Sequence, residues 1–307
     1  MNRGRILFHR DFRGYTGGHG KVWDYFNHAL ALGWDARVYL TPESLRDPSN
    51  PWMAVPCRIE PEWQPENADL LFLAGMDWQA LPRVHDGRVR VLNLVQGLRH
   101  ADPAQPLHAF LDRPATRICV SGAVAAAITA TGRVNGSVRI IPAALDLGAV
   151  MAAAPGIQGE AVFIGAAKAP RLGNELAQRA RARGHAVELA TDWLPRGEYL
   201  AAIAAAAVAV PLPATAEGFF LPGLEAMALG RPLVMPPCGG NAEYARDGVN
   251  CLMPEAESGA LVQAVERLLA SPGLGLELAV AGRATAVQHD LPAEREAFAS
   301  LIGEAIH

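Results

Sequence analysis

The sequence has little of what marks a nucleic-acid-binding, disulfide-bonded or metal-binding protein. Its 307 residues carry a net charge of −4, so we expect no broad basic surface for nucleic acid. Its four cysteines, Cys57, Cys119, Cys238 and Cys251, form no C-x-x-C pair and no metal-ligand spacing. We therefore expect them to be small buried hydrophobic residues in a reducing compartment.

Long apolar runs are also absent. The stretch 201–210 is too short to span a membrane, and the start MNRGRILFHRDF lacks the apolar segment of a signal peptide. These absences predict a cytoplasmic protein and leave open a peripheral contact with the inner face of a membrane.

Lysine is scarce. Among 27 basic residues only Lys21 and Lys168 are lysines, and each lies beside a glycine-containing loop that follows a predicted strand. Two functional cations, or a lysine-poor composition with two accidental positions, explain this pattern equally well.

The composition that remains is that of a compact globular protein, with 50% hydrophobic and 19% charged residues. Near-continuous apolar runs at 69–74 and 89–95 indicate parallel strands that are covered on both faces. Strands alternate with helical patterns along the chain, which predicts an α/β fold. The length is sufficient for two domains, and the Ala/Pro/Gly-rich run that ends near Gly159 fits a hinge between them.

The expected elements follow from these patterns. We expect strands at 5–9, 37–40, 69–74, 89–95, 117–120, 138–141, 161–165, 186–190, 208–212 and 233–235. We expect helices at about 21–32, 122–130, 172–183, 198–206, 258–270 and 292–306. Residues 41–67 show no clean period and read as an irregular excursion on the surface.

The stretch 216–243, AEGFFLPGLEAMALGRPLVMPPCGGNAE, carries the strongest functional pattern. Pro222 fits the first position of a helix, which places Glu217 in the loop before it and Glu225 in its first turns. The amides of Gly218 to Leu221 precede this helix, where N–H groups and the helix dipole favour an anion such as phosphate. A second, glycine-rich loop then allows a close backbone approach.

This stretch resembles the carboxyl-terminal signature of GT-B glycosyltransferases of the family 4 type. The matching positions occur in the family's order, and an ordinary βαβ unit is the alternative interpretation. They are Glu217-Gly218-Phe219, Leu221-Pro222, Leu224 to Ala228, Gly230, Pro232, Gly239-Gly240, Glu243 and Asp247 to Asn250.

The resemblance implies the GT-B fold, with two Rossmann-like α/β domains whose parallel sheets face a central cleft. Residues 1–147 would form an acceptor-binding domain and residues 148–290 a nucleotide-sugar-binding domain. A terminal helix at 291–307 would pack back on the first domain.

The resemblance also implies a retaining, metal-independent hexosyltransferase without a cofactor. Its donor would be a nucleotide-diphosphate sugar, and its acceptor a glycan, a lipid-linked sugar or a small molecule. Glu225 would accept hydrogen bonds from the ribose hydroxyls and Glu217 would hold a donor-sugar hydroxyl. The implied catalytic residues are Glu217, His100 and Lys168, and the implied donor-binding residues are Gly17, Gly18, Lys168, Arg171, Gly218, Phe219, Phe220, Leu221 and Glu225.

The first domain supplies two of these assignments. In the family a Gly-Gly pair after the first strand faces the donor diphosphate and the acceptor, a role carried here by Gly17 and Gly18, for which a tight turn into a helix is the alternative. The loops at 75–77 and 96–100 follow predicted strands, where ligands of parallel sheets bind. His100 is the first candidate there and Gln96 the second, with an incidental surface histidine as the alternative.

The second domain departs from the family at one place. The family has an Arg directly after the glycine of its first strand and a Lys a few residues later. Here Ala166 takes the Arg position, which leaves Lys168 and Arg171 as the available cations, with a solvated surface charge as the alternative for Arg171. Phe220 also replaces a smaller residue and would narrow the donor-sugar pocket.

Other functions stay open. Ala166 leaves room for a non-catalytic GT-B subunit that binds a partner transferase, and a GT-B nucleotide-sugar epimerase is a further alternative. Glycoside hydrolysis by paired carboxylates is disfavoured, because Glu225 would be committed to a ribose. A nicotinamide-linked oxidoreductase lacks its fingerprint, since Trp23 stands where the last glycine of G-x-G-x-x-G belongs.

Overall fold

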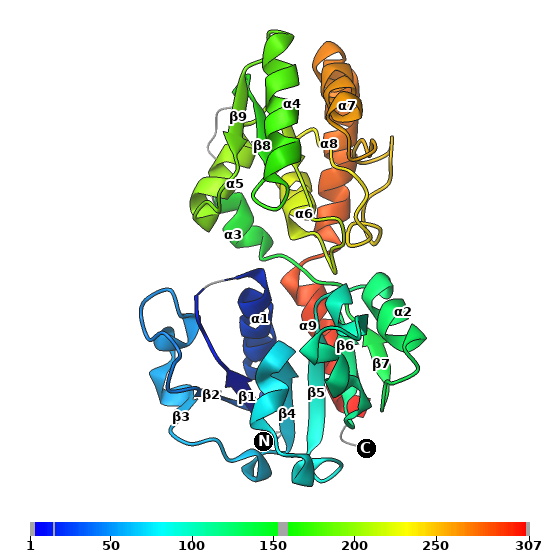
Figure 1. Ribbon diagram of the computed structural model, residues 1–307. Coiled ribbons are helices and arrows are strands. Elements are labelled where there is room, and N and C mark those ends of the chain that lie inside the picture. The colour runs from blue at the N-terminus through cyan, green and yellow to red at the C-terminus, as the bar shows by residue number, and fades with distance from the viewer. Residues whose placement is uncertain (1–3, 15, 153–158, 305–307) are drawn as a thin grey trace. The chain divides into compact units, whose positions relative to one another are not determined.

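The computed structural model describes residues 4–14, 16–152 and 159–304 of the chain (Figure 1). These residues form two compact units. The first extends to Pro142 and takes in the chain from Glu294 onward, and the second comprises Ala143–Ala293.

The first unit is built around a seven-stranded sheet in which every neighbouring pair of the described strands is parallel. The strand at the centre of the order, β4, is buried at each residue, as expected for a strand covered on both faces. In spatial order the strands are β3 (Ile59–Glu60), β2 (Asp35–Leu40), β1 (Arg5–Arg10), β4 (Leu70–Ala74), β5 (Arg90–Val95), β6 (Thr116–Cys119) and β7 (Val138–Ile140).

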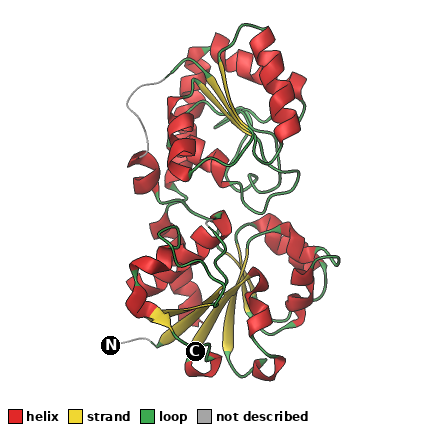
Figure 2. Ribbon diagram, turned by 60° about the vertical axis from the view of Figure 1, so that its left-hand side comes forward, coloured by secondary structure: helices red, strands yellow, loops and turns green. Residues whose placement is uncertain are grey.

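Helices cover the sheet of the first unit (Figure 2). The α-helices are α1 (Gly17–Ala31), α2 (Gly122–Ala130) and α9 (Leu291–Glu304), whose first residues belong to the second unit. Short 3-10 helices fill the connections: η1 (Pro51–Ala54), η2 (Pro56–Arg58), η3 (Pro65–Asn67), η4 (Gly75–Ala80), η5 (Arg83–His85), η6 (Leu98–Ala101) and η7 (Pro106–Asp112).

Helix α1 begins four residues earlier than the sequence predicts. The side chain of Thr16 accepts a hydrogen bond from the His19 amide at 3.3 Å, and this cap starts the helix at Gly17. Gly17 and Gly18 therefore lie in the first turn of α1, and the prediction that they belong to the preceding loop is wrong.

The interpretation of residues 41–67 as a surface excursion is wrong in part. The segment contains β3 and three 3-10 helices. Its Trp52 is fully buried, with its ring centroid 5.6 Å from that of Trp23 and 6.4 Å from that of Phe12. The free energy gained by burying so large an aromatic side chain draws the segment into the core. Cys57, in contrast, is exposed, so the expectation of four buried cysteines holds for the other three.

The second unit is built around a smaller parallel sheet of β10 (Val208–Pro211), β8 (Val162–Gly165) and β9 (Val187–Ala190), in that order. The side chain of Phe163 packs into one apolar cluster, and those of Val162 and Ile164 pack into another. Strand β8 is therefore covered on both faces. The helices are α3 (Leu147–Ala152), α4 (Pro170–Ala182), α5 (Arg196–Ala205), α6 (Leu221–Ala228), α7 (Ser258–Ala270) and α8 (Pro272–Val287).

The strand predicted at 233–235 forms only isolated bridges, Ala209 with Leu233 and Val234 with Leu252. Prolines precede and follow it, and a proline has no N–H to extend a ladder. Helix α8, which sequence patterning did not predict, packs against α6. No helix among the described residues is both long and apolar enough to cross a membrane.

A buried ion cluster joins α9 to α1 inside the first unit. The Lys21 Nζ donates a hydrogen bond to Glu294 Oε2 at 2.8 Å and pairs with Asp24 Oδ2 at 2.9 Å. The Nε2 of His28 lies 2.9 Å from the same Glu294 oxygen. Lys21 is only 4% exposed and Glu294 only 3%. One of the two lysines of this chain is thus a structural cation.

Opposing effects set the charges of this cluster. Burial alone would raise the pKa of Glu294, but Lys21 and His28 outweigh burial and lower it. Burial likewise opposes the charge of Lys21, and its two carboxylate partners raise the pKa of Lys21 above the ordinary value. A buried charge that keeps its partner costs far less than one left alone.

We therefore predict that Lys21→Met lowers the free energy of unfolding by about 3–5 kcal/mol near neutral pH, because the buried Glu294 and the partly buried Asp24 lose their cation. Because the pKa of Glu294 is lowered in the folded protein, its ionisation stabilises the fold at pH values above the unfolded-state pKa. This stabilisation is lost as the pH falls through the folded-state pKa. The difference in free energy of unfolding between the wild type and Lys21→Met should therefore become smaller as the pH falls.

Denaturant titrations followed by tryptophan fluorescence measure this change. Arg88→Met, at an exposed position of the same unit, is the control and should change stability little. Equal stability of the Lys21 and Arg88 variants would contradict the account.

Candidate functional site

In the second unit, the loop that precedes α6 packs against the glycine-rich loop that contains Cys238 and Gly240. The Glu217 amide donates to the carbonyl of Cys238 at 3.1 Å, and the Phe220 amide donates to the carbonyl of Gly240 at 3.0 Å. A Cβ atom at Gly240 would lie 2.8 Å from the Glu217 carbonyl oxygen, which is closer than real Cβ atoms approach. Only glycine allows this contact.

The same contact changes the anion site that the sequence predicts. Helix α6 begins at Leu221, with Pro222 in its first turn, as expected. Because the Phe220 amide already donates to Gly240, it does not belong to the donors that could face a phosphate. The prediction that every amide from Gly218 to Leu221 serves the anion is wrong at this residue.

The loop side chains of this stretch point in different directions. Phe220 is buried within the apolar core cluster of the second unit, so its ring supports the loop from beneath. Phe219 is half-buried, and its ring centroid lies 5.5 Å from that of Tyr244. The hydroxyl of Tyr244 donates to the Phe220 carbonyl at 2.5 Å and fixes the loop further.

The structure brings Lys168 and Glu217 together. The Lys168 Nζ donates to Glu217 Oε1 at 2.7 Å and lies 5.7 Å from the ring centroid of Phe220. The Ala214 amide donates to the same carboxylate oxygen at 3.0 Å. The two residues come from the loop after β8 and the loop before α6, so a cation and a carboxylate meet at the carboxyl-terminal side of this sheet.

Packing explains why position 166 holds an alanine instead of the arginine that the family has there. Ala166 is fully buried, and a Cβ built on Gly173 of α4 would lie 2.2 Å from its own Cβ. Helix α4 thus lies directly against this position, where an arginine side chain has no room.

Arg171 is not part of the Lys168 pair. Its side chain is 94% exposed and forms an ion pair with Glu175, one turn further along α4, at 3.1 Å. An exposed pair of this kind contributes little to stability and leaves the guanidinium in water.

Glu225 lies in a different environment from Glu217. It is 2% exposed in the middle of α6, and its Oε1 accepts a hydrogen bond from Arg196 Nη1 at 2.6 Å. Burial raises the pKa of Glu225, and Arg196 acts in the opposite direction. Sequence reasoning missed Arg196, because nothing in the signature around α6 indicates a partner from the start of α5.

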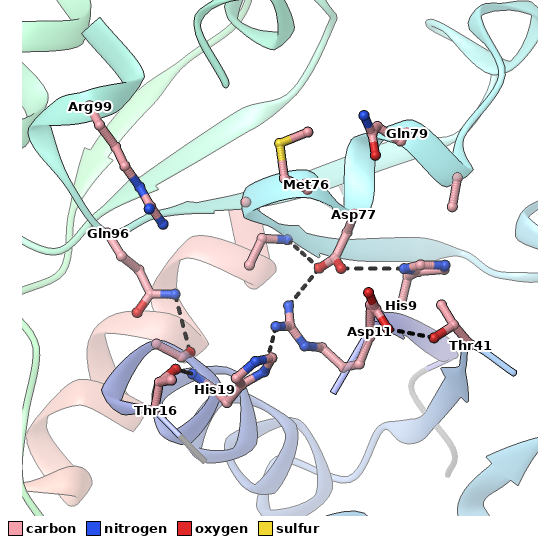
Figure 3. Close-up of a pocket in the computed structure, with 15 residues that line it drawn as sticks. His9, Asp11, Thr16, His19, Thr41, Met76, Asp77, Gln79, Gln96 and Arg99 are labelled. Carbon is pink, nitrogen blue, oxygen red and sulfur yellow. Dashed lines mark hydrogen bonds and ion pairs between the residues drawn. The ribbon is translucent and has the colours of Figure 1, made fainter. Parts of the chain in front are cut away.

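The first unit holds a polar cavity of about 510 Å³. It lies where β1, β4 and β5 end, the edge at which parallel sheets bind ligands. Figure 3 shows that its side chains come from several separate elements. The lining residues are His9, Arg10, Asp11, Thr16, Gly18, His19, Thr41, Ala74, Gly75, Met76, Asp77, Gln79, Ala80, Gln96 and Arg99.

Asp77 organises one side of this cavity (Figure 3). Its Oδ2 accepts hydrogen bonds from Arg10 Nη1 at 2.6 Å and from the Ala74 amide at 2.9 Å, and its Oδ1 lies 3.3 Å from His9 Nδ1. Arg10 Nη2 also lies 2.7 Å from His19 Nδ1. Burial, and then the charge of Arg10, lower the pKa of His19 to about 4. His19 is thus neutral near neutral pH, accepts from Arg10 at Nδ1 and can donate from Nε2.

Of the residues predicted in the first unit, Gly18 lines this cavity and its carbonyl accepts from Gln96 Nε2 at 3.2 Å. Gly17 is exposed at the first residue of α1. Gln96 lines the cavity, whereas His100 does not. His100 is buried, with Nδ1 2.9 Å from the Gly97 carbonyl oxygen, and burial lowers its pKa to about 4. Sequence reasoning missed Arg10 and His19. Their positions at and after the end of the first strand, where parallel sheets bind ligands, were the available signal.

Within 4–14, 16–152 and 159–304, no group of three or more His, Cys, Asp or Glu side chains could hold a metal ion.

Comparisons with known proteins give a family for part of the chain. Residues 122–271 match the family described as Glycosyl transferases group 1. A comparison with curated proteins finds no match.

Solved structures are similar over nearly the whole chain. Sucrose-phosphate synthase from Thermosynechococcus elongatus is 18% identical, with a TM-score of 0.70 and 99% of each chain covered. HepE of Anabaena in complex with UDP-glucose is 16% identical, with a TM-score of 0.73, covering 98% of this chain and 100% of that one. The apo form of the lipopolysaccharide outer core galactosyltransferase WaaB is 14% identical, with a TM-score of 0.69, covering 98% and 99%. Similarity at such low identity shows a shared fold.

We predict that Gly240→Ala lowers the free energy of unfolding by about 1–3 kcal/mol, because the added methyl group collides with the Glu217 backbone. Gly259→Ala in α7 is the control, since a Cβ there meets nothing within 4 Å. That control should raise stability by about 0.4–1 kcal/mol, because alanine restricts the unfolded chain. Chemical denaturation measures both variants, and the same sign of change for the two would contradict the packing argument.

Proposed function

We propose that this chain is a glycosyltransferase that transfers a sugar from a nucleoside diphosphate sugar with retention of configuration. Its residues 122–271 match the group 1 glycosyl transferases, and the chain has the predicted GT-B fold. The single observation that carries the proposal is the arrangement at α6. There Lys168, from the loop after β8, pairs with Glu217 in the loop that precedes the helix, and Glu225 is buried within the helix itself.

In this proposal the second unit binds the donor. Glu225 accepts hydrogen bonds from the ribose hydroxyls, and the positive end of the α6 dipole faces the diphosphate. HepE, which shares the fold, has been solved in complex with UDP-glucose, and this supports a uridine nucleotide as the first donor to test.

Lys168 and Glu217 carry the chemistry that we propose. As the bond between the sugar and the diphosphate breaks, negative charge develops on the leaving phosphate and positive charge on the sugar ring. A positioned cation stabilises the leaving group, and Lys168 supplies one without needing a metal ion. Glu217, held by Lys168 and the Ala214 amide, steadies a hydroxyl of the donor sugar.

None of the carboxylates at this site is proposed as a covalent nucleophile. Glu217 already pairs with Lys168 and Glu225 with Arg196. We therefore favour a front-face reaction in which the leaving phosphate takes the proton of the acceptor hydroxyl as that hydroxyl attacks the sugar. This route accounts for retention without an intermediate bound to the enzyme.

The first unit binds the acceptor in this proposal. Its cavity is lined by charged and hydrogen-bonding groups, which suits a hydroxyl-rich molecule such as a glycan or a small sugar better than an acyl chain. Neutral His19 and the carboxylate of Asp11 are placed to bind hydroxyls there. His100, being buried and neutral, supports the fold of the loop in this account rather than the reaction. The proposal keeps the expected cytoplasmic location.

A thermal-shift screen against UDP, GDP, ADP and dTDP tests the donor site. A nucleotide at about 100 times its dissociation constant adds about 2.7 kcal/mol of stability, which raises the melting temperature by a few degrees. We expect UDP to stabilise the wild type and Glu225→Ala to lose most of this response. Arg267→Gln, at an exposed position of α7, should respond as the wild type does.

Two results would contradict the proposal. The absence of a shift with all four nucleotides would remove the donor site. Binding of a nucleotide without turnover of its sugar conjugate, in the presence of a panel of sugar acceptors, would favour the non-catalytic GT-B subunit.

A further inference from the structure

We propose that Arg196 is a positioning residue of the donor site, which holds Glu225 as a carboxylate so that it can accept both ribose hydroxyls. The inference rests on the proposed function, since it assigns a second residue to the nucleotide site. It concerns the 2.6 Å pair that joins the first residue of α5 to the middle of α6.

The two partners differ sharply in exposure. The side chain of Glu225 is 3% exposed, whereas that of Arg196 is 46% exposed. The carboxylate therefore depends on its partner for its charge, while much of the guanidinium remains in water. Taking a carboxylate out of water costs several kcal/mol unless a cation and hydrogen bonds compensate for the lost solvation.

The chemistry of the ligand makes this charge matter. The two neighbouring hydroxyls of a ribose each donate a hydrogen bond. An ionised carboxylate can accept from both, whereas the protonated acid carries a proton of its own and becomes a donor at one oxygen. Glu225 is thus useful to a ribose only while it is ionised.

The elements around α6 offer no second cation for this role among the residues that the structure describes. Helix α5 contributes Arg196, the exposed Glu198 and the partly buried Tyr199. Tyr244 faces Glu225 from the loop after Gly240, and burial keeps both tyrosines as neutral phenols by raising their pKa.

Among the described helices and strands, α3, β10 and α8 also pack against α6. The sequences of α3 and β10, LGAVMA and VAVP, contain no ionisable side chain. Helix α8 presents Arg283 to Gly230, just beyond the far end of α6. Among the described residues, Arg196 is the cation that lowers the pKa of Glu225 against the effect of burial.

The experiment measures the affinity for UDP-glucose by titration calorimetry between about pH 5.5 and 8, a range in which Asp, Glu and Lys side chains with ordinary pKa values do not change charge. UDP-glucose is the probe because both of its phosphates are esterified and carry no proton that titrates in this range. The proteins are the wild type, Arg196→Gln, Arg196→Lys, Glu225→Gln, the double variant Arg196→Gln/Glu225→Gln and the control Arg267→Gln. Melting temperatures confirm that each protein is folded at the temperature of the titration.

Without Arg196, burial raises the pKa of Glu225 unopposed. A carboxylate is lost as the pH falls through its pKa, so the affinity of Arg196→Gln should fall by about tenfold per pH unit on the acidic side. The wild type, Arg196→Lys and Arg267→Gln should keep their affinity to a lower pH than Arg196→Gln does. Glu225→Gln should bind weakly at every pH, and the double variant should bind no more weakly than Glu225→Gln.

Other outcomes would overturn the inference. An Arg196→Gln profile that coincides with the wild type would show that Arg196 does not control the charge. Tighter binding by Arg196→Gln at every pH would make Arg196 a competitor for Glu225. A folded wild type that binds no UDP-glucose at any pH would overturn the proposed function itself, and the inference with it.

Discussion

The close approach of Gly240 to the backbone of Glu217 is the constraint on which the candidate donor site depends. A side chain at 240 would meet the Glu217 carbonyl at 2.8 Å, so the two loops can dock only because this residue is glycine. Docking satisfies the amides of Glu217 and Phe220 with carbonyls of the second loop. These bonds fix where α6 begins and hold the Glu217 carboxylate within reach of Lys168. Packing of two backbones thus positions charged groups that come from distant parts of the sequence.

Different surroundings stabilise the negative charges of Glu217 and Glu225. Glu217 is held by Lys168 and an amide at the surface, where water can also solvate it. Glu225 is buried, and its charge depends on Arg196. A partly solvated pair can rearrange around a substrate at little cost, whereas a buried carboxylate keeps its charge only with its partner. The Lys168–Glu217 pair is therefore suited to contact a sugar that changes position during the reaction. The buried Glu225 is suited to hold a nucleotide in one fixed position.

Much of the fold could be predicted, because the buried parallel strands read as apolar runs and most helices show regular patterns. The sequence named Lys168 and Glu217 as separate candidates, and only the structure shows that they form a pair. The start of α1 was missed because the capping hydroxyl of Thr16 outweighed two glycines. Arg196 was missed because its partner is distant in sequence, so only the packing of α5 on α6 brings them together. The burial of Trp52 was missed because an irregular segment has no period to reveal which side chain faces the core.

A crystal structure of the protein grown with UDP tests the central claim most directly, namely that the second unit is a donor site built on α6. The account predicts ribose hydroxyls within hydrogen-bond distance of Glu225 and a diphosphate against the loop before α6, near Lys168. UDP bound elsewhere, or a ribose that leaves Glu225 without a hydrogen bond to it, would contradict the account.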